Sequence, residues 1–236
     1  MFIFLPYHVF VIFTTLVKET QEAISSAKAA FPAWAAKTAK ERAAVIIKWG
    51  ELLEENKTDL AKLITLENGK PLAESLGEMG YAISFCDWFA HEARRLGGHT
   101  YPSPWANQRI MTIKQPIGVV GMITPWNFPA AMVTRKAAPA LSVGCPVILK
   151  PSEDTPLTAL AMAQLAIEAG VPSECFHVLP ACRGNTPDIG KALCESPDVK
   201  AISFTGSTAV GEILLRQSAS TVKKVSLELG GLGPFI

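Results

Sequence analysis

Four short clusters in this sequence combine residue types that bind ligands and transfer protons. In chain order they are Thr124-Pro125-Trp126-Asn127-Phe128-Pro129, Lys150-Pro151-Ser152-Glu153, Phe204-Thr205-Gly206-Ser207-Thr208, and Glu228 just ahead of Gly230-Gly231. Each cluster alone has an ordinary interpretation, respectively a turn asparagine, a surface Lys-Pro turn, a helix cap and a paired strand carboxylate. Their order and common placement favour a functional site.

The elements that position these clusters are short apolar runs, which we expect to be strands. The runs are Ile117–Ile123, Val147–Leu149, Phe176–Leu179, Ala201–Thr205 and Val225–Leu229. Stretches of helical length separate them, and this alternation predicts a parallel sheet with helices on both faces. Ligands bind beyond the carboxyl ends of such strands, where the polar clusters lie.

One of the intervening helices has clear start and stop signals. Thr155 is expected as its N-cap, Pro156 as its first helical residue and Gly170 as the residue just past its end. The segment carries an apolar stripe along one side. It is therefore predicted to pack on the sheet directly after the Lys150 cluster.

After residue 17 the chain divides into three parts by pattern. Residues 18–98 are expected to form an amphipathic helical layer, because apolar residues recur every three or four positions. Residues 99–115 break that pattern and are expected to be a linker or oligomerisation-type segment, with an extended stretch at Arg109–Ile113. Residues 116–236 hold the alternating strands and helices.

Residues 1–17 form an apolar stretch of uncertain role. It is a little shorter than the ~20 residues that span a bilayer. No basic region precedes it, and it lacks the arginines of a mitochondrial presequence. Three interpretations stay open: a signal anchor, a terminal strand and a mispredicted first exon. A membrane partner is not expected.

Composition limits the class of protein. The 236 residues are 49% hydrophobic, enough for a sizeable core. With 22 basic and 21 acidic residues the net charge is +1, so nucleic acid is not an expected partner. The five cysteines are scattered without CxxC spacing, which argues against a metal site and fits a reducing compartment. Each cysteine is expected to be a small buried hydrophobe.

The clusters also carry a resemblance to a known family. No GxGxxG fingerprint follows the first strand, which argues against an ordinary Rossmann dehydrogenase. TPWNFP, LKPSE, FTGS and LELGG, in this order and with these separations, resemble the aldehyde dehydrogenase superfamily from about Lys18 to Ile236. GKPLAE, IKQPIGVV and ELGGLGPFI resemble its NAD-dependent succinate-semialdehyde dehydrogenase branch. The resemblance implies that family's α/β fold, truncated, with residues 116–236 as a Rossmann-like NAD-binding domain.

The resemblance implies a thiol that attacks the aldehyde, a hydride transferred to NAD and water that cleaves the thioester. Asn127 would then donate its side-chain amide to the oxyanion, and Glu228 would be the general base. Burial beside Leu227 and Leu229 is expected to raise the pKa of Glu228. Arg135 stands where an arginine contacts ligand in semialdehyde-type enzymes and would pair with a substrate carboxylate, the alternative being a surface arginine.

The resemblance also implies a set of cofactor-binding residues. They are Thr124, Pro125, Trp126, Lys150, Pro151, Ser152, Glu153, Gly206, Ser207 and Gly211. Lys150 and Glu153 would hold the ribose hydroxyls, and the Glu153 carboxylate would repel a 2′-phosphate, so NAD is favoured over NADP. Gly206 would let the backbone approach the pyrophosphate, and Ser207 would begin a helix whose free N–H groups suit an anion. The local alternatives are a solvated Lys–Glu pair and a plain helix cap.

The implied activity is oxidation of succinate semialdehyde to succinate, in 4-aminobutyrate degradation, by a homo-oligomeric full-length parent. The resemblance implies a mitochondrial location, with the cytoplasm as the alternative. The family's nucleophilic cysteine lies downstream of Glu228, so this chain is expected to be an amino-terminal part that is inactive alone. Cys145 enters its strand from the wrong end to substitute. The alternative is a non-catalytic NAD-binding or interaction module, but retention of Asn127 and Glu228 favours the enzyme.

Overall fold

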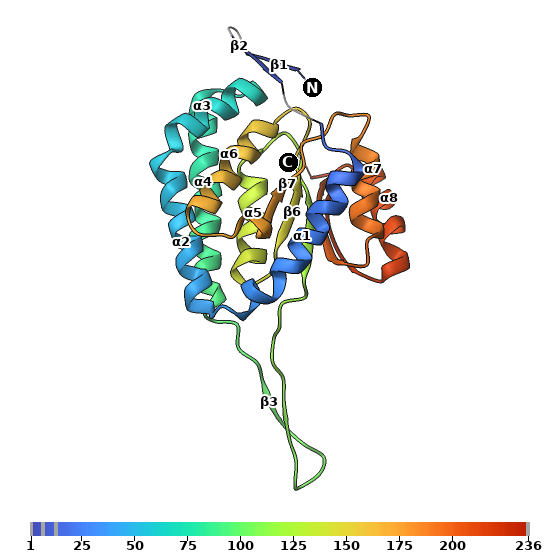
Figure 1. The fold of residues 1–236 in the computed structure, drawn as a ribbon. Helices are drawn as coiled ribbons and strands as arrows, with labels where there is room; N and C mark the ends of the chain where they lie inside the picture. Colours follow the sequence, from blue (N-terminus) through green and yellow to red (C-terminus); the bar gives the residue numbers. More distant parts are fainter. Residues whose placement is uncertain (1, 6–7, 12–13, 235–236) are drawn as a thin grey trace.

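The computed structural model describes residues 2–5, 8–11 and 14–234, with side chains from residue 14 onward. A five-stranded parallel sheet lies at the centre (Figure 1). Its strands, in the order β7-β6-β5-β8-β9, are β7 (Phe176–Val178), β6 (Val147–Lys150), β5 (Val119–Ile123), β8 (Val199–Gly206) and β9 (Lys224–Leu229). The predicted α/β fold with a parallel sheet is confirmed.

The chain winds outward from β5 in both directions, which sets the helices on two faces. One face is covered by α5 (Ala131–Ser142) and α6 (Pro156–Glu168), and the other by α7 (Thr186–Glu195) and α8 (Thr208–Ser218). The winding reverses between β5 and β8. In open α/β sheets, the crevice at such a reversal is where ligands bind. Two short 3₁₀ turns, Ser173–Cys175 and Ala219–Thr221, precede β7 and β9.

Strand faces follow the two-residue alternation of extended chain. In β6, Val147 and Leu149 pack into the core under α5 and α6, whereas Ile148 packs into the core under α7 and α8. β5 begins two residues later than predicted because Gly118, with φ 120°, does not continue the strand. Both faces of β6 are therefore buried, as an uninterrupted apolar run indicates.

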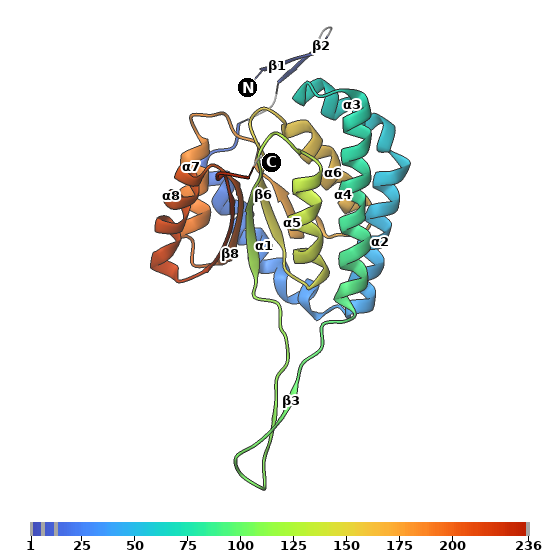
Figure 2. The same ribbon diagram turned by 180° about the vertical axis from the view of Figure 1, so that it is seen from behind.

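Three of the amino-terminal helices form a second layer over α5 and α6, whereas α1 (Val17–Ala36) packs directly on the sheet beside α7. The three helices of the layer are α2 (Ala39–Glu55), α3 (Lys57–Asn68) and α4 (Leu72–Ala93). Two buried indoles join the amino-terminal helices to α5 and α6: Trp34 Nε1 donates to Leu141 O at 3.0 Å, and Trp49 Nε1 donates to Met162 O at 3.0 Å. Figure 2 shows α4 running beside α5. The layer thus reaches the loops that follow β5 and β6.

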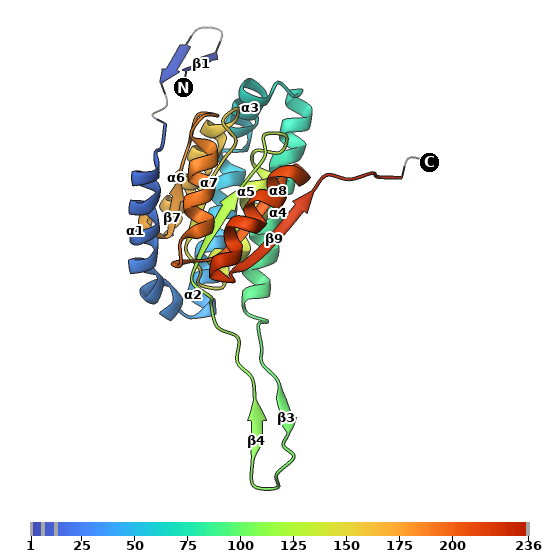
Figure 3. The ribbon, with the colours of Figure 1, turned by 90° about the vertical axis from the view of Figure 1, so that its right-hand side faces the viewer.

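Two hairpins extend away from the core. β3 (Thr100–Pro102) and β4 (Arg109–Met111) pair antiparallel and form a projecting arm (Figure 3). At the amino terminus β1 (Phe2–Leu5) pairs antiparallel with β2 (His8–Val11). Residues 1, 6–7 and 12–13 of the apolar segment lie outside the described part of the chain. None of the described helices combines the length and apolar character needed to cross a membrane.

Candidate active site

The fold brings the four polar clusters to one edge of the sheet. Ile123, the last residue of β5, is in register with Lys150 on β6 and with Phe204 on β8. Thr205 is in register with Glu228 on β9. The loop of Asn127, the Lys150 cluster and the start of α8 therefore all lie at the carboxyl ends of the strands, around the reversal point.

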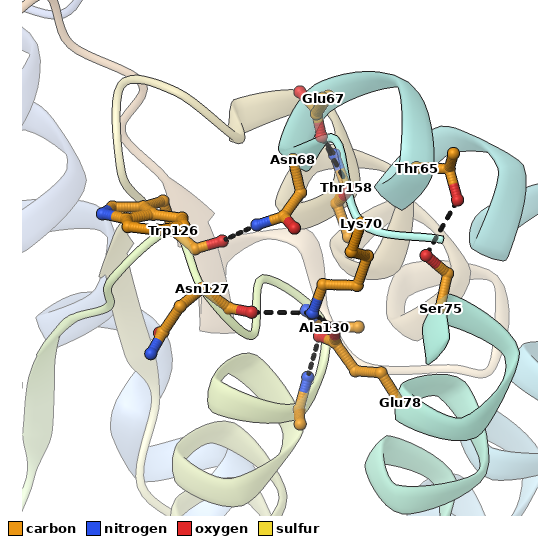
Figure 4. A network of polar contacts seen from close by, with 11 residues as sticks. Thr65, Glu67, Asn68, Lys70, Ser75, Glu78, Trp126, Asn127, Ala130 and Thr158 are labelled. Carbon is orange, nitrogen blue, oxygen red and sulfur yellow. Dashed lines mark hydrogen bonds and ion pairs between the residues drawn. The ribbon is translucent and has the colours of Figure 1, made fainter. Parts of the chain in front are cut away.

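Asn127 is held through its backbone. Its carbonyl oxygen accepts a hydrogen bond from Lys70 Nζ at 2.7 Å, and the carbonyl of Trp126 accepts one from Asn68 Nδ2 at 2.7 Å. The Asn127 side chain is exposed and extends away from Lys70 in Figure 4. Among the hydrogen bonds of the described residues, none involves its side-chain amide. The amide is thus available to donate to a ligand, unlike the side chain of a self-bonded turn asparagine.

Glu228 is paired with a cation. Its Oε1 lies 3.0 Å from Arg135 Nη2, and its Oε2 accepts a 3.4 Å hydrogen bond from Thr205 Oγ1. The Glu228 side chain is 42% exposed, so the predicted burial among apolar residues is wrong. Leu227 and Leu229 flank it in sequence, but successive strand residues point to opposite faces. Leu227 packs instead into the core on the α7 and α8 side.

Lys136 was missed by the sequence reasoning and lies beside this pair. Its side chain is buried, and its Nζ donates to Ser203 Oγ at 2.9 Å. Burial lowers the pKa of Lys136, the Glu228 carboxylate raises it, and the Arg135 guanidinium lowers it. The available signal was a lysine between apolar residues of α5 on a helix predicted to cover the sheet, since a charge buried there must find a partner.

A cavity of about 760 Å³ opens beside these charges, within the range of small-molecule sites. Arg135, Lys136 and Glu228 line one side of it. Tyr81, Phe85 and Phe89 of α4 line another. A separate groove between α1 and α7 contains none of the predicted site residues. The cavity thus combines an aromatic wall with a charged one.

The Lys150–Glu153 pair is more enclosed than the Arg135–Glu228 pair. Lys150 Nζ lies 3.4 Å from Glu153 Oε2, and the exposed fractions of the two side chains are 4% and 21%. Burial lowers the pKa of Lys150, and the Glu153 charge opposes that shift. Arg183, which the sequence reasoning missed, places Nε 3.4 Å from Glu153 Oε1 while its side chain is 91% exposed. The pair is therefore not the solvated surface pair considered above.

The pKa of Glu153 is lowered by these surroundings. Burial acts to raise it, but a backbone hydrogen bond and the positive charge of Lys150 outweigh that effect, and Arg183 adds to the lowering. The carboxylate is consequently ionised over the physiological range and is a hydrogen-bond acceptor only.

The aldehyde dehydrogenase family model matches residues 13–236. This chain belongs to the aldehyde dehydrogenase family. It is 55% identical over 218 residues to succinate-semialdehyde dehydrogenase [NADP(+)] GabD of Escherichia coli, covering 92% of this chain and 45% of that protein. It is 51% identical over 220 residues to the human mitochondrial succinate-semialdehyde dehydrogenase, covering 93% and 41% respectively.

Solved structures agree with this assignment. The chain superimposes on succinate-semialdehyde dehydrogenase from Burkholderia pseudomallei with a TM-score of 0.93 and 51% identity, covering 97% of this chain and 47% of that one. A betaine aldehyde dehydrogenase mutant from Staphylococcus aureus in complex with NAD+ gives a TM-score of 0.89 and 33% identity, covering 96% and 46%. The chain spans less than half the length of these relatives. Aldehyde dehydrogenases use nicotinamide cofactors, and the relatives' names include both NADP and NAD.

Within this aldehyde dehydrogenase fold, the glycines at the start of α8 have packing reasons of their own. A Cβ at Gly206 would overlap the ring of Phe204. A Cβ at Gly211 would lie 2.6 Å from Leu229 Cδ2, so Gly211 allows α8 to pack on β9. Ser207 Oγ caps the first turn of α8, as the helix-cap interpretation expects. The remaining free N–H groups of that turn face the site edge.

The other predicted cofactor residues lie in the two loops. Thr124 is buried, and its N–H donates to Lys150 O at 3.2 Å. Ser152 is buried as well, and its Oγ accepts from Asp154 N at 3.3 Å. Pro151 is buried, and Pro125 is half-buried. These residues join the carboxyl ends of β5 and β6.

The cysteines fall into two groups. Cys86, Cys145, Cys175 and Cys194 are buried, as expected, and burial raises the pKa of each thiol, that of Cys175 to about 12. Cys182 is half-buried, and a hydrogen bond with the Thr14 side chain lowers its pKa. Cys145 lines the same cavity as Glu228 but is kept protonated by burial. In the described part of the chain, no group of three or more His, Cys, Asp or Glu side chains could hold a metal.

Proposed function

We propose that this chain forms the cofactor-binding part of an enzyme that oxidises succinate semialdehyde to succinate with NAD, in 4-aminobutyrate degradation. The observation that carries the proposal is the gathering of Asn127, Glu228 and the Lys150–Glu153 pair at one sheet edge. The likeness to several succinate-semialdehyde dehydrogenases supports the choice of substrate.

The residues fit a nicotinamide cofactor. Lys150 supplies a donor and Glu153 an acceptor, which suits the two hydroxyls of a ribose. The first turn of α8 offers N–H groups to a pyrophosphate. The ionised Glu153 would repel a 2′-phosphate, which is our reason for proposing NAD. When bound, the cofactor supplies the hydride acceptor.

Three side chains would act on the substrate. The free amide of Asn127 donates to the oxyanion that forms at the aldehyde carbon. Glu228 accepts the proton of the attacking water, or of the thiol, while Arg135 keeps its carboxylate in place. Arg135 is also the proposed partner of the substrate carboxylate, which would compete with Glu228 for the guanidinium. The exposure of both side chains permits that exchange.

The full-length gene product tests the proposal, with oxidation of succinate semialdehyde measured in the presence of NAD. We expect turnover, and we expect Asn127→Ala to reduce kcat by about 10²–10³ fold. The 236-residue chain by itself should show none, because its four buried thiols are protonated and the half-buried Cys182 follows β7, at the opposite edge of the sheet from β9 and Glu228. NAD binding without turnover in the full-length product would favour the non-catalytic module instead.

Assembly and location belong to the same proposal. We propose a homo-oligomer, with the projecting β3–β4 arm as part of the contact, since exposed apolar residues such as Trp105 and Met111 lie on it. We propose a mitochondrial location if the source is a eukaryote, because relatives from human and Arabidopsis thaliana are named mitochondrial. The cytoplasm is the alternative. Sedimentation and cell fractionation test these two points.

A further inference from the structure

We propose that residues 67–70, which we call the clamp, position both loops of the site, a proposal whose catalytic consequence rests on the function proposed above. The clamp lies at the end of α3, outside the sheet. One half of it fixes the loop that carries Asn127. The other half fixes the loop that carries Lys150 and Glu153. The four residues thereby set the distance between the oxyanion end and the ribose end of the site.

The first half of the clamp acts on backbone atoms around Asn127. Asn68 donates to the carbonyl of Trp126, and Lys70 donates to the carbonyl of Asn127, both at 2.7 Å (Figure 4). Lys70 Nζ also lies 4.3 Å from the centre of the Phe128 ring. Because all of these contacts leave the Asn127 amide alone, they orient it without occupying it.

A buried carboxylate fixes Lys70 in turn. Glu78 is 3% exposed, and its Oε2 pairs with Lys70 Nζ at 2.5 Å. Its Oε1 accepts from the backbone N–H of Ala130 at 2.8 Å and of Ala131 at 3.2 Å, at the start of α5. The loop of Asn127 is therefore fixed at its middle by Lys70 and at its end by Glu78.

The second half of the clamp caps α6. Glu67 accepts from the backbone N–H of Leu157 at 2.6 Å and of Thr158 at 2.8 Å, and from Thr158 Oγ1 at 2.6 Å. Thr155 is the N-cap residue and Pro156 the first helical residue, as predicted, but the Thr155 side chain makes no capping hydrogen bond, and its buried Oγ1 has no hydrogen-bond partner among the described residues. The capping carboxylate comes instead from a residue 90 positions away. The loop of Lys150 and Glu153 is thus tied to β6 at one end and to α3 at the other.

Gly69 joins the two halves. It is the C-cap of α3 and has φ 83°, the left-handed conformation that a residue with a Cβ adopts only at a cost. The turn ends the helix after Asn68 and directs Lys70 toward Glu78. The spacing of the two halves is therefore fixed by a rigid turn.

Hydrogen–deuterium exchange on the 236-residue chain separates positioning from general stability. We expect Lys70→Met to speed exchange in residues 124–131 by at least about tenfold while residues 155–162 keep their rate. We expect Glu67→Gln to do the reverse. Lys57→Met, which removes an exposed ion pair with Glu54 near the start of the same helix, is the matched control and should change neither.

If Lys70→Met does not fold, Asn68→Ala is the milder variant and should speed exchange in residues 124–131 alone. If amide exchange becomes faster by the same factor across the whole chain, the role of these residues is purely structural and the clamp proposal is overturned. No change in either loop would overturn it as well. This readout needs no turnover, so it stands apart from the test of the proposed function.

Kinetics of the full-length gene product supply the catalytic readout. We expect Lys70→Met to lower kcat by ~10²-fold with the KM for NAD nearly unchanged, because a misplacement of about 1 Å has that effect. Lys70→Arg should recover part of kcat. Glu67→Gln should raise the KM for NAD about fivefold and spare kcat. If Lys70→Met and Glu67→Gln both lower kcat and have the same effect on the KM for NAD, the division of the clamp into two halves is contradicted.

Discussion

Glu153 and Glu228 lie at the same edge of one sheet, and each is paired with a basic side chain. Glu153 shares its carboxylate with Lys150, which is 4% exposed, whereas Glu228 faces Arg135, which is 39% exposed. A buried pair with few partners available keeps one arrangement, while an exposed pair exchanges partners with water and ligand at little cost. The enclosed glutamate suits recognition of a fixed group, and the open one suits proton transfer.

Among the tests of this difference between Glu153 and Glu228, the largest effect is expected from Glu228→Gln in the full-length gene product. The amide keeps the size of the side chain but cannot accept a proton, so kcat should fall by about 10²–10⁴ fold. The dissociation constant for NAD, measured by calorimetry, should change by less than about twofold. A weaker cofactor complex with unchanged kcat would reverse the roles assigned to the two carboxylates.

Glu153→Ser should alter the choice of cofactor instead. Without the repelling carboxylate, the ratio of kcat/KM for NADP to that for NAD should rise on the order of tenfold. Asp154→Ser, which removes an exposed neighbouring charge, is the control and should leave the ratio nearly constant. An unchanged ratio for Glu153→Ser would remove the basis for proposing NAD.

A smaller effect is expected from Arg183→Ala. The guanidinium offsets part of the Glu153 charge but is 91% exposed, so screening by water and salt limits its influence. Its removal should lower the NADP to NAD ratio by less than about fivefold, and the effect should shrink as salt is added. Arg216→Ala provides an exposed arginine on α8 for comparison. A rise in the NADP to NAD ratio for Arg183→Ala would contradict the proposed offset of the Glu153 charge.

The smallest expected change is in the ionisation of Lys136. The Glu228 carboxylate raises the pKa of this buried lysine, so Glu228→Gln should lower that pKa further and leave a larger neutral fraction at alkaline pH. NMR titration of the Lys136 ε-methylene group in the 236-residue chain measures it, with exposed Lys62 as the internal reference. An unchanged Lys136 pKa in the variant would mean that the two groups do not interact, and a higher pKa would contradict the attraction between them.

The sequence was informative where one residue's role depends on its neighbours in the chain. The five strands could be predicted because apolar runs bounded by Gly and Pro are a local signal. The helix that begins at Pro156 could be predicted from the start signals at Thr155 and Pro156 and from the stop signal at Gly170. The polar clusters were located at the ends of these strands, and the resemblance then implied their roles. Their gathering at one edge follows from parallel topology alone.

The surroundings of each side chain were harder to predict, because they depend on contacts between distant segments. Thr155 is the N-cap residue of α6, as predicted, but the side chain that caps the helix is Glu67, and no local sequence pattern indicates a carboxylate from another helix. The apolar surroundings expected for Glu228 were inferred from sequence neighbours that point to the opposite face. Arg183 lies at the Glu153 carboxylate only because the chain folds back after β7.

The loop held by the clamp contains an exposed tryptophan, whose fluorescence can be measured. Trp34 and Trp49 are almost fully buried, whereas Trp88, Trp105 and Trp126 are 63%, 62% and 54% exposed. Trp126 alone among these lies in the loop that residues 67–70 hold, directly before Asn127. After Trp88 and Trp105 are replaced by Phe, acrylamide should quench essentially one indole, and a change in that quenching on addition of NAD would report a change in the exposure of the loop.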